Sequence, residues 1–555
     1  MKINFLKLTF ACIVLFAISC SKPASDLSLY IPKDASAVFI INPKSITDKI
    51  ASSGITIDSF ANLFTKHNNE YALRWNDIEN SGIDLNNPVY TFSKSANSMQ
   101  QGAVVSSALI ASITDEKKLE AFLKKEKVGG DILSADNYKY YALGNDYVAG
   151  WTNKVLIISR VSGGNAAPGN YSSGQGTLSQ TQLTTLFSQK ESASIASLDG
   201  FNDVLSKQDD IRFYTNSSAG FNSTAIPGMS KVNTLLDGSY TEGIIDFEKG
   251  KAIASTEFHP GKALADILKK YPSKEINTNI IKNYPDSLSG FGVVSFNPKV
   301  LIDILQYLGF DMMINGFASN VGFTLNDIVN AFSGDIAVMF SKGSGQAMED
   351  SVQGTFKATH PNNFIASFTI GDKAAFNKVL TGLVSKNILT KNGDYYQLGE
   401  AGGHGFAIEV ADDKLIIASG TEMADAYKSS TQKSSLPQDV EKEINNKSMA
   451  FYVDINSLLN NTDAEQPAAI HLHDKYFVFA NSMQAAKATF KNFLVTSDKS
   501  DGKTYKANFE LNFVNDNENS LASLAKFIAF AHKEDIENKK DSSSQMPDSL
   551  NEPGK

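Results

Sequence analysis

The stretch PKDASAVFIINPKSI at residues 32–46 decides the fold, because the chain carries a second version of it, PDSLSGFGVVSFNPKVL, at residues 285–301. Each version runs from a proline-led turn through an apolar run into an Asn-Pro-Lys triplet. The triplets begin at Asn42 and Asn297, 255 positions apart. Self-similarity at a fixed period is the signature of a repeated structural unit. We therefore expect two copies of one domain in tandem.

Further matches follow in the same order along the chain. Two of them keep the shift of 255, namely Ile110-Ala111-Ser112 with Ile365-Ala366-Ser367 and Tyr140-Tyr141-Ala142-Leu143-Gly144 with Tyr395-Tyr396-Gln397-Leu398-Gly399. Others occur at nearby shifts: Gly82-Ile83-Asp84-Leu85-Asn86 with Gly322-Phe323-Thr324-Leu325-Asn326, Phe92-Ser93-Lys94 with Phe340-Ser341-Lys342, and Lys154-Val155-Leu156-Ile157 with Lys414-Leu415-Ile416-Ile417. The constant order supports duplication over chance.

Strand and helix patterns alternate within each copy. The apolar run Ala37 to Ile41 lacks alternation, which predicts a strand covered on both faces. Asn42 is then a suitable helix cap, and Pro43 suits the first helical position, where its missing N–H costs nothing. Later in each copy, residues 195–198 and 450–453 are predicted to be strands.

Helical spacing of apolar residues predicts helices over residues 373–383 and around Leu119 to Leu123. Near the end of each copy two strands flank a turn, at Gly250 and at Asp501-Gly502, and Asp-Gly is a strong hairpin signal. Hairpins mixed with single helices predict an α+β fold, with an antiparallel or mixed sheet and helices packed on one face of it.

The repeat sets the expected domain boundaries. We predict a signal peptide at residues 1–19, a tether at 20–29, α+β repeat domain 1 at 30–272, a polar linker at 273–283, α+β repeat domain 2 at 284–534, and a disordered tail at 535–555.

The N-terminus has the order of a secretory signal: Lys2 and Lys7, an apolar stretch from Leu8 to Ile18, and small residues before Cys20. Ala17-Ile18-Ser19 fits a lipobox-like pattern, although leucine is more usual where Ala17 stands. An ordinary signal peptide ending near a cysteine is the alternative. Because Cys12 would be removed with the signal, Cys20 would be the mature chain's only thiol. We predict lipidation at Cys20 and no internal disulfide.

Composition excludes some partners. The 555 residues carry a formal charge of -9, and removal of Lys2 and Lys7 with the signal would make it -11. No basic stripe offsets this charge, so we expect no nucleic-acid partner. Hydrophobic residues make up 42% of the chain, which is enough for sizeable cores. Apart from the signal, no apolar run reaches the length of a membrane span, so the expected partners are a membrane through the N-terminal lipid and an unknown envelope ligand or protein.

Cys20 behind its lipobox-like run, the opening IPKDASAVFIINPKSI at residues 31–46 and its second version at 284–301 resemble a family of uncharacterised Bacteroidota envelope lipoproteins. This family is grouped under a domain of unknown function, and the resemblance covers nearly the whole chain. It implies a Gram-negative envelope setting, and it implies no activity and no catalytic residue.

Familiar catalytic signatures are absent from the sequence, which has no HExxH, GxSxG, GxxxxGK[ST] or GxGxxG. We therefore predict no catalytic residue and no cofactor. The S-x-x-K spacing of penicillin-recognising enzymes occurs at Ser430, Ser500 and Ser523, but no KTG accompanies it. In a chain rich in serine and lysine, this two-residue pattern is expected by chance.

Two further groups have a functional and a structural interpretation. His471 and His473 would face the same way on a strand, beside Asp474, and are weak candidates for metal ligands, although two histidines on a solvent-facing strand need no metal. Aromatic residues gather at Tyr138, Tyr140, Tyr141, Tyr147 and Trp151. They could stack on a sugar or peptide, but strand alternation would divide them between two faces, which favours packing.

These observations lead to two functional hypotheses. The first is a non-catalytic, lipid-anchored envelope protein that binds or scaffolds an unknown partner. We expect it at the outer membrane facing the periplasm, and exposure on the cell surface is the alternative. The second is a periplasmic or surface hydrolase of glycans or peptides, with paired carboxylates that spacing cannot reveal.

Overall fold

The computed structural model describes residues 26–52, 54–62, 75–98, 102–125, 130–144, 146–163, 175–219, 229–341, 347–350, 355–358, 363–398, 406–411, 413–429, 434, 436–459 and 479–531. Two compact units divide the chain. Unit 1 comprises residues 1–46, 73–224 and 240–244, and unit 2 comprises residues 47–72, 225–239 and 245–555. The last boundary falls inside β9 (Tyr240–Phe247). The boundaries expected from the repeat, 30–272 and 284–534, stay predictions.

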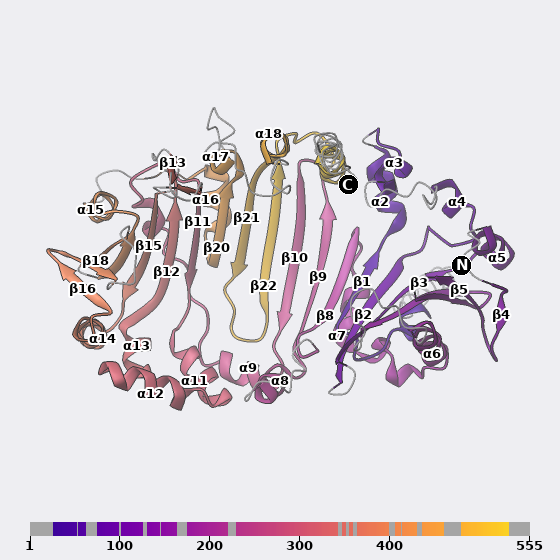
Figure 1. Ribbon diagram of the computed structural model, residues 1–555, viewed down its shortest axis with the longest axis horizontal. Coiled ribbons are helices and arrows are strands. Elements are labelled where there is room, and N and C mark those ends of the chain that lie inside the picture. The colour runs from indigo at the N-terminus through magenta and orange to yellow at the C-terminus, as the bar shows by residue number, and fades with distance from the viewer. Residues whose placement is uncertain are drawn as a thin grey trace, which may run out of the picture. The chain divides into compact units, whose positions relative to one another are not determined.

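Unit 1 is built on an antiparallel sheet with helices (Figure 1). In order of pairing its strands are β8 (Ile211–Asn216), β1 (Ala37–Ile41), β2 (Val89–Ser98), β3 (Gly102–Ser112), β7 (Val155–Gly163), β6 (Tyr147–Trp151), β5 (Lys139–Gly144) and β4 (Leu133–Ser134). Its helices are η1 (Asp26–Tyr30), α4 (Trp75–Glu79), α5 (Glu116–Lys125), α6 (Gln175–Phe187), η3 (Glu191–Ala193), η4 (Ile195–Ser197) and α7 (Asp199–Ser206), with α2 (Pro43–Ala51) crossing into unit 2.

Helices cover both faces of the unit 1 sheet, and not one face as the sequence predicts. On β7, Val155 and Ile157 join the core that includes Leu183 of α6. The alternate residue Leu156 points to the other side and joins Leu119 of α5. Because successive strand residues face opposite ways, the two cores lie on opposite faces.

Unit 2 contains a longer antiparallel series. Its strands pair in the order β10 (Lys251–His259), β22 (Tyr505–Phe513), β21 (Phe490–Asp498), β20 (Lys447–Asp454), β11 (Gly290–Ser295), β12 (Phe332–Phe340), β15 (Phe364–Ile370), β19 (Lys414–Ala418), β18 (Ala407–Ala411), β17 (Tyr395–Leu398) and β16 (Leu389–Asn392). β13 (Ala347–Asp350) and β14 (Thr355–Ala358) pair separately.

Helices of unit 2 lie near both ends of these strands (Figure 1). They are α3 (Ile57–Asn62), α8 (Met229–Leu236), α9 (Lys262–Leu268), α10 (Asn279–Lys282), α11 (Lys299–Leu308), α12 (Asp311–Val321), α13 (Leu325–Ala331), α14 (Lys373–Ser385), α15 (Thr421–Ser429), α16 (Gln438–Ile444), α17 (Ile455–Leu459), α18 (Phe479–Thr489) and a last helix at Ser520–Ala531. The main core packs α10, α15 and α16 on the strands around Phe291 and Tyr452. The predicted linker 273–283 contains α10, and Ile276, Ile280 and Ile281 within it are buried in this core.

The eight strands of unit 1 and the last eight of unit 2 follow the same order of connection. In unit 1 the order of pairing is β8, β1, β2, β3, β7, β6, β5 and β4. In unit 2 the strands at the same positions are β20, β11, β12, β15, β19, β18, β17 and β16. The mixed α and β content and the antiparallel pairing that the sequence predicts are confirmed.

Local signals in the sequence produce the expected local structures. The Asn42 side chain accepts a hydrogen bond from Ser45 N at 3.2 Å, and α2 begins at Pro43. α14 covers the predicted helix at 373–383, with Asp372 accepting from Ala374 N and Ala375 N. β21 and β22 pair across the Asp501-Gly502 turn, where Gly502 adopts a φ of 90°. These features depend on neighbours in sequence, which is why the sequence predicts them well.

Two predicted strand features are wrong. The strand predicted at residues 195–198 does not form, because residues 195–197 make the short 3₁₀ helix η4, and the next strand along the chain is β8. The strand predicted at residues 450–453 does form, as part of β20. β1 is not covered on both faces: Val38 and Ile40 are buried, but Phe39 between them is 39% exposed. A run of apolar residues fixes the strand, yet long-range packing decides which face is covered.

Candidate apolar binding surface

The sequence candidates for lipid and metal binding lie outside the described residues. Cys20 precedes the first described residue, Asp26, and His471 and His473 fall between 460 and 478. The S-x-x-K motif at Ser430 to Lys433 also lies outside them. Their predicted roles therefore remain predictions.

The other two S-x-x-K motifs form ordinary structural contacts. Ser523 Oγ donates to a carboxylate oxygen of Glu518 at 2.8 Å, and Lys526 pairs with the other oxygen of that carboxylate. Ser500 Oγ donates to the carbonyl of Thr504 at 2.6 Å within the β21–β22 turn. A nucleophilic serine needs its proton accepted by a base, and Ser500 donates instead to a backbone carbonyl. Ser523 and Lys526 both contact Glu518, a contact at the start of the last helix.

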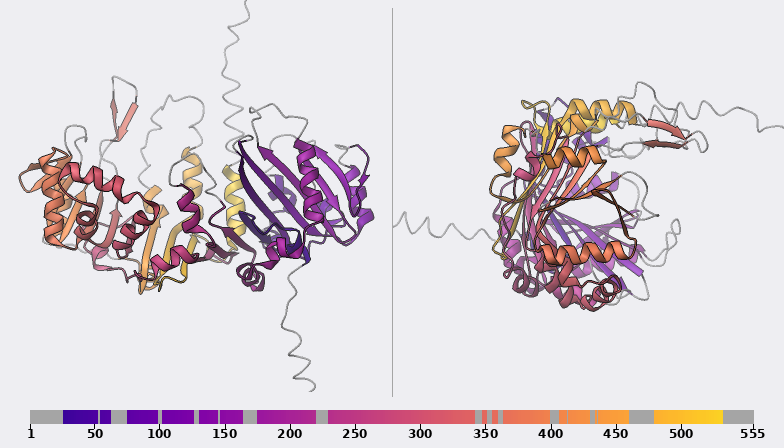
Figure 2. Two further views of the ribbon diagram at one scale, coloured as in Figure 1. Left: turned by 90° about the horizontal axis from the view of Figure 1, so that it is seen from below. Right: turned by 90° about the vertical axis from the view of Figure 1, so that its left-hand side faces the viewer.

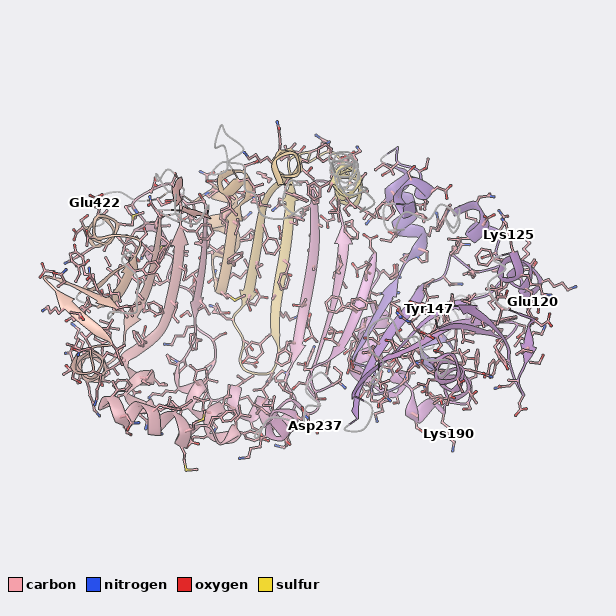
Figure 3. All side chains as sticks on the ribbon, viewed as in Figure 1. Glu120, Lys125, Tyr147, Lys190, Asp237 and Glu422 are labelled. Carbon is pink, nitrogen blue, oxygen red and sulfur yellow. The ribbon has the colours of Figure 1, made fainter. Side chains whose placement is uncertain are left out.

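The aromatic cluster of unit 1 is divided between two cores, as strand alternation predicts. Tyr138 stacks on Phe187 of α6 at 4.5 Å between ring centroids. Tyr141 and Trp151 are buried in the opposite core beneath α5. Tyr147, labelled in Figure 3, is 40% exposed, with the Arg160 guanidinium 5.1 Å from its ring centroid. This geometry supports packing as the role of the cluster.

A buried carboxylate in unit 2 also has a structural partner. Glu409 on β18 is 2% exposed and accepts a hydrogen bond from Lys428 of α15 at 2.5 Å, which raises the pKa of Lys428. Nearby, a hydrogen bond to Asp425 and burial raise the pKa of Tyr395 to about 12. Glycosidases need a carboxylate that exchanges protons with its substrate, whereas one oxygen of Glu409 pairs with Lys428, and the other, Oε2, is buried without a hydrogen-bond partner among the described residues.

Open cavities in unit 2 have few groups for chemistry. One of about 570 Å³ lies between α18 and the last helix, and one of about 400 Å³ lies beside α14 and the end of α12. Each is lined by one lysine, Lys526 and Lys378, and both lysines are engaged in ion pairs, with Glu518 and Asp327.

The most unusual surface of the described chain is the elbow formed by α11 and α12. α11 ends at Leu308. The next residue, Gly309, has a φ of 80°, which allows its N–H and that of Phe310 to donate to the last carbonyls of the helix. α12 starts at Asp311, and its axis is bent by 119° from that of α11. Both helices lie at the same end of the strands (Figure 1), the end from which the left panel of Figure 2 is viewed.

Large apolar side chains of the elbow point into solvent. On α12, Met312 is 78% exposed, Met313 56% and Phe317 71%, and Leu301 on α11 is 45% exposed. Single exposed apolar residues are normal on protein surfaces. Three on one short helix form a patch, and exposed apolar patches mark interaction sites.

Contacts on the inner side of the elbow hold these apolar side chains in an outward direction. Ala318 of α12 is buried, and Asn315 Oδ1 accepts a hydrogen bond from Leu325 N at 2.9 Å, which ties α12 to the start of α13. Val300 and Ile304 of α11 pack on a small core around Leu264 of α9. The elbow therefore cannot turn its exposed face inward without breaking these contacts.

Charges at the elbow are few and mostly compensated. Asp303 of α11 pairs with Lys270 at 2.9 Å, which raises the pKa of Lys270. Asp311 stands in the first turn of α12, where the helix dipole stabilises a carboxylate.

Within the described part of the chain, no single helix is long and apolar enough to cross a membrane, although α11 and α12 together meet both requirements despite their bend.

This surface was not among the sites that the sequence predicts. The signal that could have revealed it is the stretch 299–323, in which Lys299, Asp303 and Asp311 are the only charged residues. Such a stretch is equally compatible with two buried core helices. Only tertiary contacts distinguish the two cases.

The capping box beside the elbow gives a pH-dependent prediction. Asp327 accepts hydrogen bonds from Lys378 Nζ and Thr324 N, both at 2.7 Å, and these bonds hold its pKa below the ordinary range. A lowered folded-state pKa contributes stability above the unfolded pKa, and that stability is lost as pH falls through the folded pKa. We expect Asp327→Asn to lower the free energy of unfolding by about 1 kcal/mol at neutral pH, with the deficit shrinking as the pH falls below the ordinary pKa of an aspartate and the carboxylate is protonated.

Urea unfolding of both proteins across this pH range measures the effect. Asp413→Asn is the control, because the Asp413 side chain is 67% exposed and its loss should change stability by less than about 0.5 kcal/mol. A deficit for Asp327→Asn that is constant with pH would contradict the assigned role of the ionised carboxylate.

The comparison with protein families identifies the chain. Residues 29–521 match the profile of a family described as "Domain of unknown function (DUF4836)". The chain belongs to the DUF4836 family. The matched range contains nearly all described residues of this DUF4836 protein, including the elbow. No curated protein matches it.

Two solved structures align distantly with this DUF4836 chain. A structure titled "Structure of crystal form I of TP0453" aligns with a TM-score of 0.25 and 11% identity over 47% of this chain and 84% of the other. Crystal form IV of TP0453 aligns with a TM-score of 0.25 and 10% identity over 42% and 80% of the two chains. Similarity at this level does not establish a shared fold.

Proposed function

We propose that this DUF4836 protein is a non-catalytic, lipid-anchored binding or scaffolding protein of the Bacteroidota cell envelope, held at the outer membrane and facing the periplasm. The observation that carries the binding role is the exposed apolar face of α12, where Met312, Met313 and Phe317 are each more than half exposed. A patch of this kind on a rigid support serves contact with another apolar surface. The serines and the carboxylate described above are engaged in structural contacts, which gives catalysis no comparable support.

We also propose that the body arose by tandem duplication. The sequence matches at a shift of 255 residues support this origin, as does the order of strands β8 to β4 in unit 1, which recurs as β20 to β16 in unit 2. Duplicated copies diverge most in their loops and surfaces.

The lipid anchor is tested at the two cysteines of the sequence. We expect Cys20→Ser to abolish incorporation of labelled fatty acid and to move the protein from the membrane fraction to the soluble fraction. The reason is that only a cysteine thiol accepts the lipid, and the described part of the chain has no single helix that could replace the anchor. Metabolic labelling and membrane fractionation measure both effects.

Cys12→Ser is the matched control, because Cys12 lies in the apolar part of the predicted signal peptide and should be removed with it. We expect this variant to be labelled like the natural protein. Continued labelling of Cys20→Ser would overturn the assignment. Turnover of glycosidase or peptidase substrates by the purified protein would overturn the non-catalytic role.

A further inference from the structure

We propose that the α11–α12 elbow is a second membrane contact, in which α12 lies flat in the interface of a bilayer. This inference rests on the proposed lipid anchor, which keeps the protein beside a membrane. It adds the identity of the surface that the exposed apolar face meets: a phospholipid bilayer and not a protein.

The geometry favours an interfacial position over a spanning one. α12 has 11 residues, so it is about 16 Å long. The hydrocarbon core of a bilayer is about 30 Å thick. Neither helix can cross it, and the bend of 119° prevents the pair from forming one straight span. A short helix whose apolar side chains are on one face lies in the plane of the membrane, with those side chains in the acyl boundary.

The composition of the outward face fits this environment. Its exposed residues are Met312, Met313, Gly316, Phe317, Ser319 and Asn320. None is charged, so insertion to a shallow depth requires no ion to lose its hydration. The small polar groups of Ser319 and Asn320 suit the headgroup region. Methionine can adapt to disordered acyl chains because its unbranched side chain is flexible and polarizable.

Two lysines lie on or beside the elbow. Lys299 is the exposed first residue of α11. At the corner of the elbow, the ammonium of Lys231 lies 3.1 Å from the point that a Cβ on Gly309 would occupy. Lysines flanking an apolar face keep their charge in the interface while their stems contact the apolar region. They are therefore suited to meet anionic headgroups, in spite of the chain's overall negative charge.

The size of the patch argues against a second copy as the occupant. If a large side chain has an accessible area of about 200 Å², the exposed fractions of Leu301, Met312, Met313 and Phe317 amount to roughly 500 Å². A stable protein interface buries about 800 Å² on each partner. A bilayer imposes no such minimum, because the lipid anchor already supplies part of the affinity.

The test places a polarity-sensitive, thiol-reactive fluorophore on Phe317→Cys in the full-length, processed lipoprotein. Because Cys20 should be acylated and Cys12 removed, the introduced cysteine should be the only free thiol. Leu398→Cys on β17 is the matched control, since Leu398 is also an exposed apolar residue of unit 2, at 49%. Both proteins are reconstituted into vesicles of phosphatidylethanolamine and phosphatidylglycerol, with and without lipids that carry a nitroxide quencher.

We expect the probe at 317 to shift to the blue, to brighten at least about threefold and to be quenched by the nitroxide lipid, as for a side chain in the acyl boundary. The probe at 398 should do none of these. An unquenched probe at 317 would overturn the inference. So would a blue shift that rises with protein concentration in detergent without vesicles, because that result would identify a second copy as the occupant.

A second variant separates the elbow from nonspecific adsorption. The double variant Met312→Glu, Ser319→Cys places a charge on the outward face of α12 and carries the probe at position 319. We expect its quenching to be more than tenfold weaker than that of Ser319→Cys alone, with the far-ultraviolet circular dichroism unchanged. Persistent quenching would overturn the inference. Mass spectrometry of the N-terminal peptide reports separately on the lipid anchor. An unmodified Cys20 would contradict the proposed anchor, whereas quenching of the probe at 317 in vesicle-bound protein would still support membrane contact by the elbow.

Discussion

Replacing Trp151 with alanine is expected to lower the free energy of unfolding of unit 1 by about 3–5 kcal/mol. Trp151 on β6 is fully buried, and it fills the core between the sheet and α5 together with Leu119, Leu123 and Tyr141. Truncation removes the largest side chain of this core and leaves a cavity that two elements of regular structure cannot close.

Trp151→Phe separates packing from hydrogen bonding. The indole Nε1 is buried without a hydrogen-bond partner among the described residues. A buried donor without a partner costs about 1–3 kcal/mol. Removing the indole N–H recovers this cost, which offsets part of the stability that is lost with the smaller side chain. We expect Trp151→Phe to cost less than about 2 kcal/mol. Urea unfolding followed by far-ultraviolet circular dichroism measures both variants. Equal losses for the two variants would show that the indole is hydrogen-bonded.

Gly82→Ala is expected to destabilise unit 1 by about 3–5 kcal/mol, more than the equivalent change in unit 2. Gly82 has a φ of 82°, and a Cβ there would lie 2.2 Å from the carbonyl oxygen of Asp115. That residue cannot retreat easily, because Thr114 N and Asp115 N both donate to Gly82 O, at 2.8 and 3.3 Å. The substitution therefore adds a clash between backbone segments to the strain of a left-handed conformation.

Gly322→Ala is the matched control, because the sequence repeat pairs Gly322 with Gly82. Gly322 ends α12 with a φ of 94°, but nothing lies within 4 Å of its would-be Cβ. Only the conformational strain of about 1–2 kcal/mol should remain. The difference in urea midpoint between the two variants, at equal m-value, gives the steric part of the effect. Equal losses would show that the Asp115 segment moves to accommodate a methyl group.

The two glycines also illustrate how far the repeat can be used for prediction. Both occupy the left-handed region, which the paired sequence motifs GIDLN and GFTLN anticipate. The surroundings of the two residues differ, because α5 packs close to one and open space lies beside the other. Local conformation therefore follows the motif, whereas the energetic cost of a change depends on segments far away in the sequence.

The candidate surface shows the same division. The apolar content of residues 299–323 is visible in the sequence, and so is the glycine that ends each helix. Whether Met312 and Phe317 are buried could not be predicted, because a core helix and an interfacial helix have the same local composition. Ala318 of α12 is buried, and α11 packs on α9. These contacts leave Met312, Met313 and Phe317 facing the solvent.

The sequence by itself determined the α+β class, the helix that follows the Asn42 cap, the helix over residues 373–383, and the Asp501-Gly502 hairpin, since these depend on residues a few positions apart. The tertiary structure alone decided that helices cover both faces of the unit 1 sheet, that Phe39 is half-exposed within an apolar run, and that α12 presents its apolar side to solvent. The physical reason is that burial is a property of contacts between distant segments, and one sequence pattern is compatible with several such arrangements.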